Sequence, residues 1–208
     1  MPRWSGRRVR ALLAAPVTAV LLLGGCTGGA PTATESSTAP PVQTPTPTPS
    51  STPSETPVVD VTVKPERPAA LDEPPSVEGA VAVAEYFVDL FPYINATGDL
   101  ADWGRLSHPE CIFCADSNDS VQAKVTLGHH DEGGSIDVVS RTATEVEPGA
   151  WYTVTLEFAQ APSVTVDAAG ALIEEFPEAK TIRSNLVVLW QGGTWQVRGV
   201  DSAVVGQT

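Results

Sequence analysis

The chain has 208 residues, with 25 acidic and 12 basic side chains and a formal net charge of −13. Its length is enough for one domain with a hydrophobic core. The excess of acid excludes a surface built for nucleic acid or for anionic lipid headgroups, because both need clustered lysine and arginine.

The first 26 residues have the form of a bacterial export signal. Four arginines and no acid open the chain, an apolar run follows over residues 11–23, and Leu23-Gly24-Gly25-Cys26 resembles the bacterial lipobox. The run is shorter than the ~20 residues of a membrane-spanning helix. We therefore predict a signal peptide over residues 1–25 and lipidation of Cys26, which anchors the protein at the extracytoplasmic face of the cell membrane. An ordinary cleaved signal with an incidental cysteine is the alternative.

Residues 26–70 are predicted to be the lipidated cysteine and a disordered tether. Proline, threonine and serine dominate this segment and aromatic residues are absent. Such a composition cannot bury enough apolar surface to offset the entropy of folding, and Thr-Pro repeats favour an extended spacer. One globular domain is predicted over residues 71–208.

The domain begins with helical patterns. Apolar residues recur every three or four positions over residues 76–94, with Ser76 as the cap. Pro92 is expected to kink or end this helix, and Glu85 and Asp89 are expected to face solvent.

Two shorter helices are expected next. Asp99 can cap one that carries Trp103 and Leu106. Ser117 can cap another that ends at Gly128.

The second half of the domain changes to strand patterns. Segments rich in β-branched and aromatic residues predict strands over 135–147, 151–167, 181–191 and 194–205. Pro148-Gly149 predicts a turn, and Gly192-Gly193 predicts a tight hairpin. Residues 168–180 fit a short strand, a helical turn or a loop. Helices followed by strands predict an α+β fold, with the N-terminal helices packed on a curved antiparallel sheet of about four strands.

The order of elements resembles the cone-shaped nuclear-transport-factor-like (cystatin-like) fold, in which helices close over a curved sheet. The overall layout is also similar to an uncharacterised family of actinobacterial lipoproteins, a domain of unknown function. The matching residues are Cys26, Thr97-Gly98-Asp99, Cys111, Cys114, Gly133-Gly134 and Trp195-Gln196-Val197. This resemblance implies a lipoprotein with no known activity.

The stretch HPECIFCAD, residues 108–116, carries two cysteines three positions apart. A zinc site with His108 and either His129 or His130 is one interpretation, and a thiol redox centre is another. An exported domain meets an oxidising environment, and lipid occupies Cys26. We therefore favour a Cys111–Cys114 disulfide that turns Ile112 and Phe113 toward the core, and we assign neither a metal nor a cofactor.

The sequence carries no motif for a catalytic nucleophile, a phosphate loop or a dinucleotide. We assign no catalytic residue and favour a non-catalytic binding domain, whose partner is an envelope protein or a small molecule. The alternative is a small-molecule enzyme with His129 or His130 paired to Asp131 or Glu132. The side chains proposed to line a pocket are Tyr86, Tyr93, Trp103 and Trp151.

Overall fold

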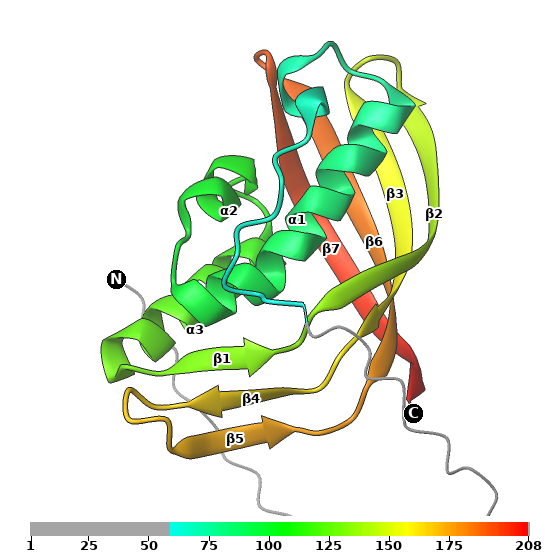
Figure 1. Cartoon of the computed structure of the whole chain (residues 1–208). Coiled ribbons are helices and arrows are strands. Elements are labelled where there is room, and N and C mark those ends of the chain that lie inside the picture. Colours follow the sequence, from blue (N-terminus) through cyan, green and yellow to red (C-terminus); the bar gives the residue numbers. More distant parts are fainter. Residues whose placement is uncertain (1–58, 208) are drawn as a thin grey trace, which may run out of the picture. The chain divides into compact units, whose positions relative to one another are not determined.

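The computed structural model describes residues 59–207. The predicted signal peptide, Cys26 and the tether as far as residue 58 lie outside the described residues. Within them, three α-helices pack on one face of a curved four-stranded sheet, and a three-stranded sheet adjoins it (Figure 1). The predicted α+β class is confirmed. No helix between residues 59 and 207 is long and apolar enough to cross a membrane.

The long helix α1 (Val77–Thr97) lies across the main sheet (Figure 1). The predicted cap is confirmed, since Ser76 Oγ accepts a backbone N–H of the first turn at 2.9 Å. Pro92 does not end the helix, which continues to a left-handed Gly98 (φ 73°). Residues on nearly all sides of α1 are buried, so that tertiary packing holds the turn after the proline.

The short helix α2 (Ala101–Leu106) buries Trp103 and Leu106. Its N-cap is Leu100 and not Asp99 as predicted, although Asp99 Oδ1 accepts the Ala101 N–H at 3.1 Å at the start of the helix. The helix thereby fixes one large aromatic side chain over α1.

The third helix, α3 (Ile112–Leu127), starts earlier than predicted. Its N-cap is Cys111, and Ser117 lies inside the helix, where its hydroxyl donates to the carbonyl of Phe113 at 2.8 Å. The prediction that Ser117 caps the helix is therefore wrong. Gly128 ends the helix as expected, with a left-handed φ of 72°.

The main sheet is antiparallel throughout, with the order β2–β3–β6–β7. Its strands are β2 (Ile136–Glu147), β3 (Trp151–Gln160), β6 (Lys180–Gln191) and β7 (Thr194–Gln207). The last two strands form the predicted hairpin, and both glycines of its Gly192-Gly193 turn have positive φ. Along β3, every second residue from Tyr152 to Phe158 is buried, as the alternation predicted.

The smaller sheet has the order β1–β4–β5. Its strands are β1 (His130–Gly133), β4 (Ser163–Val166) and β5 (Leu172–Phe176). The chain passes between the two sheets at Gly133-Gly134, at Pro162 and at Pro177, where a regular strand is interrupted. The prediction of one strand over residues 151–167 is thus wrong, and the ambiguous segment 168–180 contains β5.

Residues 59–70, assigned to the tether from the sequence, pack against the domain. Val61 is buried, and Lys64 Nζ lies 2.7 Å from Asp102 Oδ2. Trp195 Nε1 donates to the carbonyl of Ala70 at 2.9 Å, next to a 3₁₀ turn over Ala69–Asp72. The folded part therefore begins before the predicted boundary at residue 71.

Glu85 and Asp89 of α1 were expected to face solvent, but both are partly buried. Glu85 pairs with Arg141 of β2 at 2.9 Å, and Asp89 lies half-buried beside the segment that contains Val61. Burial, together with the neighbouring charge of Glu85, raises the pKa of Asp89 from 3.8 to about 6. A carboxylate held in this way opposes folding once it is ionised.

Replacing Asp89 with asparagine should stabilise the protein above pH 6 by about 1 kcal/mol, a value reduced for the partial exposure of the site. In the folded state the carboxyl holds its proton more tightly than in the unfolded state. Its contribution to stability is therefore fully present below pH 3.8 and is lost as the pH rises to about 6. Urea unfolding of both proteins at pH 4 and pH 7.5 measures the difference; an equal gain at both pH values would contradict this prediction.

Candidate functional site

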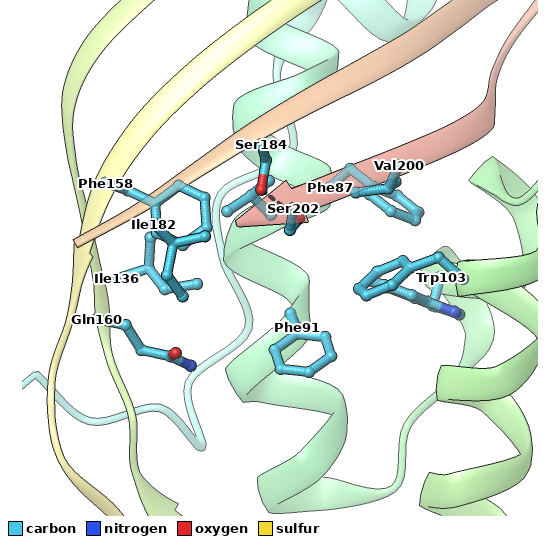
Figure 2. Close-up of a pocket in the computed structure, with 12 residues that line it drawn as sticks. Phe87, Phe91, Trp103, Ile136, Phe158, Gln160, Ile182, Ser184, Val200 and Ser202 are labelled. Atoms are coloured by element: carbon cyan, nitrogen blue, oxygen red, sulfur yellow. Dashed lines mark hydrogen bonds between the residues drawn. The ribbon is translucent and has the colours of Figure 1, made fainter. Parts of the chain in front are cut away.

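A cavity of about 220 Å³ lies between the helices and the main sheet (Figure 2). The helices contribute four aromatic side chains to its lining: Phe87, Phe91, Trp103 and Phe113. The sheet contributes Ile136, Phe158, Ile182 and Val200, and the polar members of the lining are Gln160, Ser184 and Ser202. The wall is thus mostly apolar, with hydroxyl and amide groups on the side formed by the sheet.

Trp103 organises the helical wall of the cavity. Its ring stacks on Phe87 with centroids 4.1 Å apart and an angle of 20° between the planes, and Phe91 and Phe113 pack at its edges with centroids 6.2 Å away. Its indole Nε1 donates to the carbonyl of Cys114 at 3.1 Å. Trp103 is only 1% exposed, so this bond satisfies a buried donor and fixes the ring against α3.

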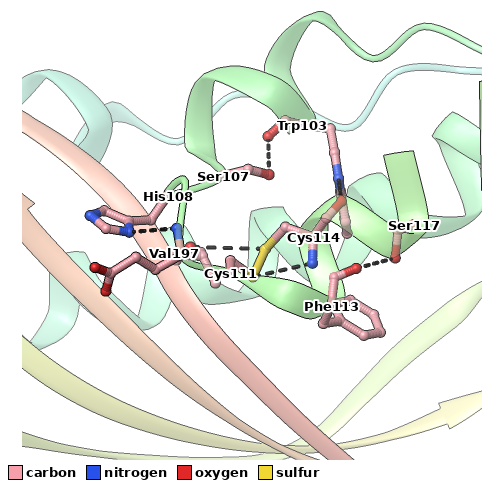
Figure 3. Close-up of a disulfide and its surroundings, with 9 residues drawn as sticks. Trp103, Ser107, His108, Cys111, Phe113, Cys114, Ser117 and Val197 are labelled. Atoms are coloured by element: carbon pink, nitrogen blue, oxygen red, sulfur yellow. Dashed lines mark hydrogen bonds between the residues drawn. A yellow bond between two sulfur atoms is a disulfide. The ribbon is translucent and has the colours of Figure 1, made fainter. Parts of the chain in front are cut away.

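The disulfide between Cys111 and Cys114 is present as predicted (Figure 3). Cys111 is the N-cap residue of α3, and the backbone N–H of His108 donates to the carbonyl of Val197 on β7 at 3.0 Å. The bridge therefore closes the crossover from α2 to α3 where this crossover meets the main sheet. One part of the prediction is wrong: Phe113 packs inward, but Ile112 is 77% exposed.

The disulfide bears on the zinc and redox interpretations of the two cysteines. Sulfur atoms joined in a disulfide are not thiolate ligands for zinc. A helix opens at this motif, with Cys111 as its N-cap, and that placement favours redox chemistry. Each cysteine is, however, only 1% exposed, so that a partner thiol has no access to the bridge.

The polar part of the cavity wall includes a pair of hydroxyls on adjacent strands. Ser184 of β6 and Ser202 of β7 are cross-strand partners, with their Oγ atoms 2.5 Å apart (Figure 2). Either hydroxyl can donate to the other. The one that accepts keeps its own proton available to a ligand in the cavity.

Of the four predicted pocket residues, only Trp103 lines this cavity. The hydroxyl of Tyr86 donates to Asp102 at 2.8 Å, and that of Tyr93 donates to Asp99 at 2.8 Å. Burial and the carboxylate of Asp102 raise the pKa of Tyr86 to about 12. Both tyrosines therefore tie α1 to the segment around α2.

Trp151 also lies away from the cavity. It begins β3, and the guanidinium of Arg198 lies 5.7 Å from the centroid of its ring. Its ring therefore packs beside the cation of Arg198 at the start of β3.

The histidine and carboxylate cluster does not converge on the cavity. His130 and Glu132 point to one side of β1, with His130 Nε2 3.7 Å from Glu132 Oε1. Asp131 has different neighbours: Lys124 Nζ lies 2.5 Å away, and the hydroxyl of Thr165 donates to it at 2.7 Å. Neither His129 nor His130 is part of the cavity lining. The pair that the enzyme alternative requires is therefore not at this site.

The sequence pattern alone does not mark most of the residues that line the cavity. Phe113 was expected only to face the core, and Ile136, Ser184 and Ser202 were not singled out. The alternation of buried and exposed residues along β6 gives a partial indication, because Ser184 occupies the same face as buried apolar residues. The side chains that each helix adds to the cavity wall depend on packing between segments that are distant in the sequence.

Comparison with solved structures gives several partial matches. The intermembrane-space region of the chloroplast protein ARC6 is 10% identical, with a TM-score of 0.46, and the match covers 62% of this chain and 96% of that one. An uncharacterised protein with a cystatin-like fold from Caulobacter vibrioides is 10% identical, with a TM-score of 0.39 and coverage of 61% and 90%. A putative scytalone dehydratase from Novosphingobium aromaticivorans is 13% identical, with a TM-score of 0.36 and coverage of 61% and 84%.

Comparison with curated proteins gives no match. The model of one protein family matches residues 51–201, which include every residue of the cavity lining except Ser202. That family, DUF6318, is described as a family of unknown function. The chain belongs to the DUF6318 family.

Proposed function

We propose that this protein is a lipid-anchored extracytoplasmic lipoprotein whose domain binds a small, mainly apolar molecule without transforming it. The observation that carries the binding proposal is the aromatic cavity between α1 and the main sheet. Its lining side chains are apolar groups, hydroxyls and one amide, which can hold and orient a ligand. General acid–base catalysis uses imidazole, carboxylate, amine, thiol or phenol groups, and the lining consists of other groups.

The size of the cavity bounds the ligand. A protein cavity of about 150 Å³ accommodates benzene. The cavity of about 220 Å³ therefore suits a fused two-ring compound or a short branched chain. Stacking on the aromatic wall of Phe87, Phe91 and Trp103 favours a planar ring.

The proposed anchor rests on the sequence. Leu23-Gly24-Gly25-Cys26 fits a lipobox, and the following segment rich in proline and threonine suits a spacer between a membrane and a domain. Two or more acyl chains on Cys26 would give a stable anchor. The cavity would then be presented to molecules outside the cytoplasm.

Binding can be tested with 2-naphthalenemethanol on the purified full chain in detergent, by equilibrium dialysis against a detergent blank. We expect a Kd on the order of 100 µM, from the usual binding energy per ligand atom. Val200→Phe fills the cavity from β7 and should weaken binding by about tenfold or more, whereas Val205→Phe adds the same ring to an exposed position on the same strand. Equal binding by both folded variants, checked by their thermal unfolding, would refute the site.

The anchor can be tested by replacing Cys26 with alanine and following metabolic fatty-acid labelling. The label should be lost and the protein should move from the membrane fraction to the soluble fraction, because the thiol is the attachment point. Unchanged labelling of the variant would rule out lipidation at this residue.

A further inference from the structure

The apolar cavity adjoins a second, polar hollow. A cleft of about 290 Å³ lies where the main sheet passes into the smaller sheet, and it is bordered by Gly133-Gly134, Ala161 and Lys180. Phe91 and Gln160 line both the cavity and the cleft. The two hollows therefore meet between the middle of α1 and the end of β3.

At this junction, Gln160 presents an amide without a partner. Figure 2 shows its side chain pointing from β3 toward Phe91. Among residues 59–207, the side chain of Gln160 makes no hydrogen bond, whereas Asn95, Lys124 and Asp131 at the walls of the cleft are bonded to one another or to Thr165. An amide at the end of an apolar cavity is suited to bind the polar end of a ligand.

A cation stands next to this amide on the same face of the sheet. Gln160 of β3 and Lys180 of β6 are direct cross-strand partners in an antiparallel ladder. The Cβ atoms of such partners lie about 4.5–5.5 Å apart and their side chains project to the same side. The cleft thus has two neighbouring N–H donors at its inner end.

The other cation of the cleft is already neutralised. Lys124 Nζ lies 2.5 Å from Asp131 Oδ2 and donates to Asn95 Oδ1 at 3.0 Å. Lys180 has no carboxylate within ion-pair distance among the described residues, and its ammonium lies 6.0 Å from the ring centroid of Phe176. Lys180 is therefore the cation that a ligand can engage.

We propose that the ligand is an amphipathic carboxylic acid, whose apolar ring or branched chain fills the cavity and whose carboxylate lies over Gln160 and Lys180. This inference rests on the proposed binding function and adds the chemistry of the polar end. One ammonium and one amide match a single negative charge. The second negative charge of a phosphate would find no further unpaired cation among the described residues of the cleft and would lie near Glu178, which also lines it.

The test compares 2-naphthoate with 2-naphthalenemethanol, which share a ring but differ in charge, on the full chain at pH 7.5. The wild type should bind the acid about tenfold more tightly than the alcohol. Lys180→Met should abolish this preference. The affinity for the acid should fall by about tenfold, and the affinity for the alcohol should change by less than about twofold. Gln160→Leu should reduce the affinity for the acid by about threefold.

Arg183→Met is the matched control for Lys180→Met. It removes one positive charge from the same strand, but Arg183 is paired with Glu157 at 2.8 Å and does not line the cleft. It should leave both affinities unchanged. If the two compounds bind equally to the wild type, or if Lys180→Met and Arg183→Met have the same effect, the carboxylate proposal is overturned while the cavity stands. If neither compound binds, the proposed function fails as well. Tighter binding of 1-naphthyl phosphate than of 2-naphthoate would also overturn the choice of a carboxylate.

Discussion

Replacing Trp103 with alanine should destabilise the protein by about 3–5 kcal/mol, which is the usual range for removing a large aromatic side chain from a core. The ring is 1% exposed and packs against Phe87, Phe91 and Phe113. Its removal also leaves the carbonyl of Cys114 without the indole donor. Since small domains are stable by about 5–15 kcal/mol, this loss would be a large part of the total. Urea unfolding followed by circular dichroism measures it.

Trp103→Phe is the control that separates packing from hydrogen bonding. It keeps an aromatic ring next to Phe87 and removes only the N–H that reaches Cys114, so the expected loss is about 1–2 kcal/mol. A loss below about 1.5 kcal/mol for the alanine variant would mean that the helices collapse onto the cavity without the indole. Trp103 would then not be the side chain that holds the wall open.

Gly133→Ala should be the most damaging single change in the connection between the two sheets, with an expected loss of about 3 kcal/mol. Gly133 has a φ of 79°, which disfavours residues that carry a Cβ. A Cβ at this position would lie 2.6 Å from the carbonyl oxygen of Pro162, which is backbone and cannot rotate away. That oxygen also accepts the N–H of Gly134 at 2.8 Å, so a shift would break this bond.

Gly149→Ala is the matched control for Gly133→Ala. Its φ is 67°, and a Cβ there would meet no atom within 4 Å, so only the backbone conformation is penalised. The expected loss is about 1 kcal/mol. Comparison of the two melting curves isolates the effect of the close approach, and equal losses would show that crowding by Pro162 has no role.

Local chemistry in the sequence was enough to locate several elements. Ser76 caps α1, Gly128 ends α3, and Gly192-Gly193 makes the β6–β7 turn, because each depends on groups close in the chain. The disulfide was also predictable, since its two cysteines lie three residues apart. Pro162 could have divided the long predicted strand, because proline cannot donate to a ladder.

The cavity shows what tertiary structure adds. Simple counting from the hairpin turn places Asp201 opposite Ser184, but the register shifts at the bulge beside Val187 and Val188. Ser202 therefore becomes the partner of Ser184, and Val200 faces the cavity with it. A shift of one residue exchanges the two faces of a strand, so this bulge replaces a carboxylate with a hydroxyl at the cavity wall.

The α+β class, the antiparallel hairpin, the disulfide, the start of α1 and the end of α3 follow from the sequence, because short-range steric and hydrogen-bonding rules govern these features. Only the tertiary structure decided which aromatic side chains meet and that the tyrosines turn away to Asp99 and Asp102. It also decided that Gln160 and Lys180 stand together at the end of the cavity. These placements depend on strand register and on helix packing between segments far apart in the chain.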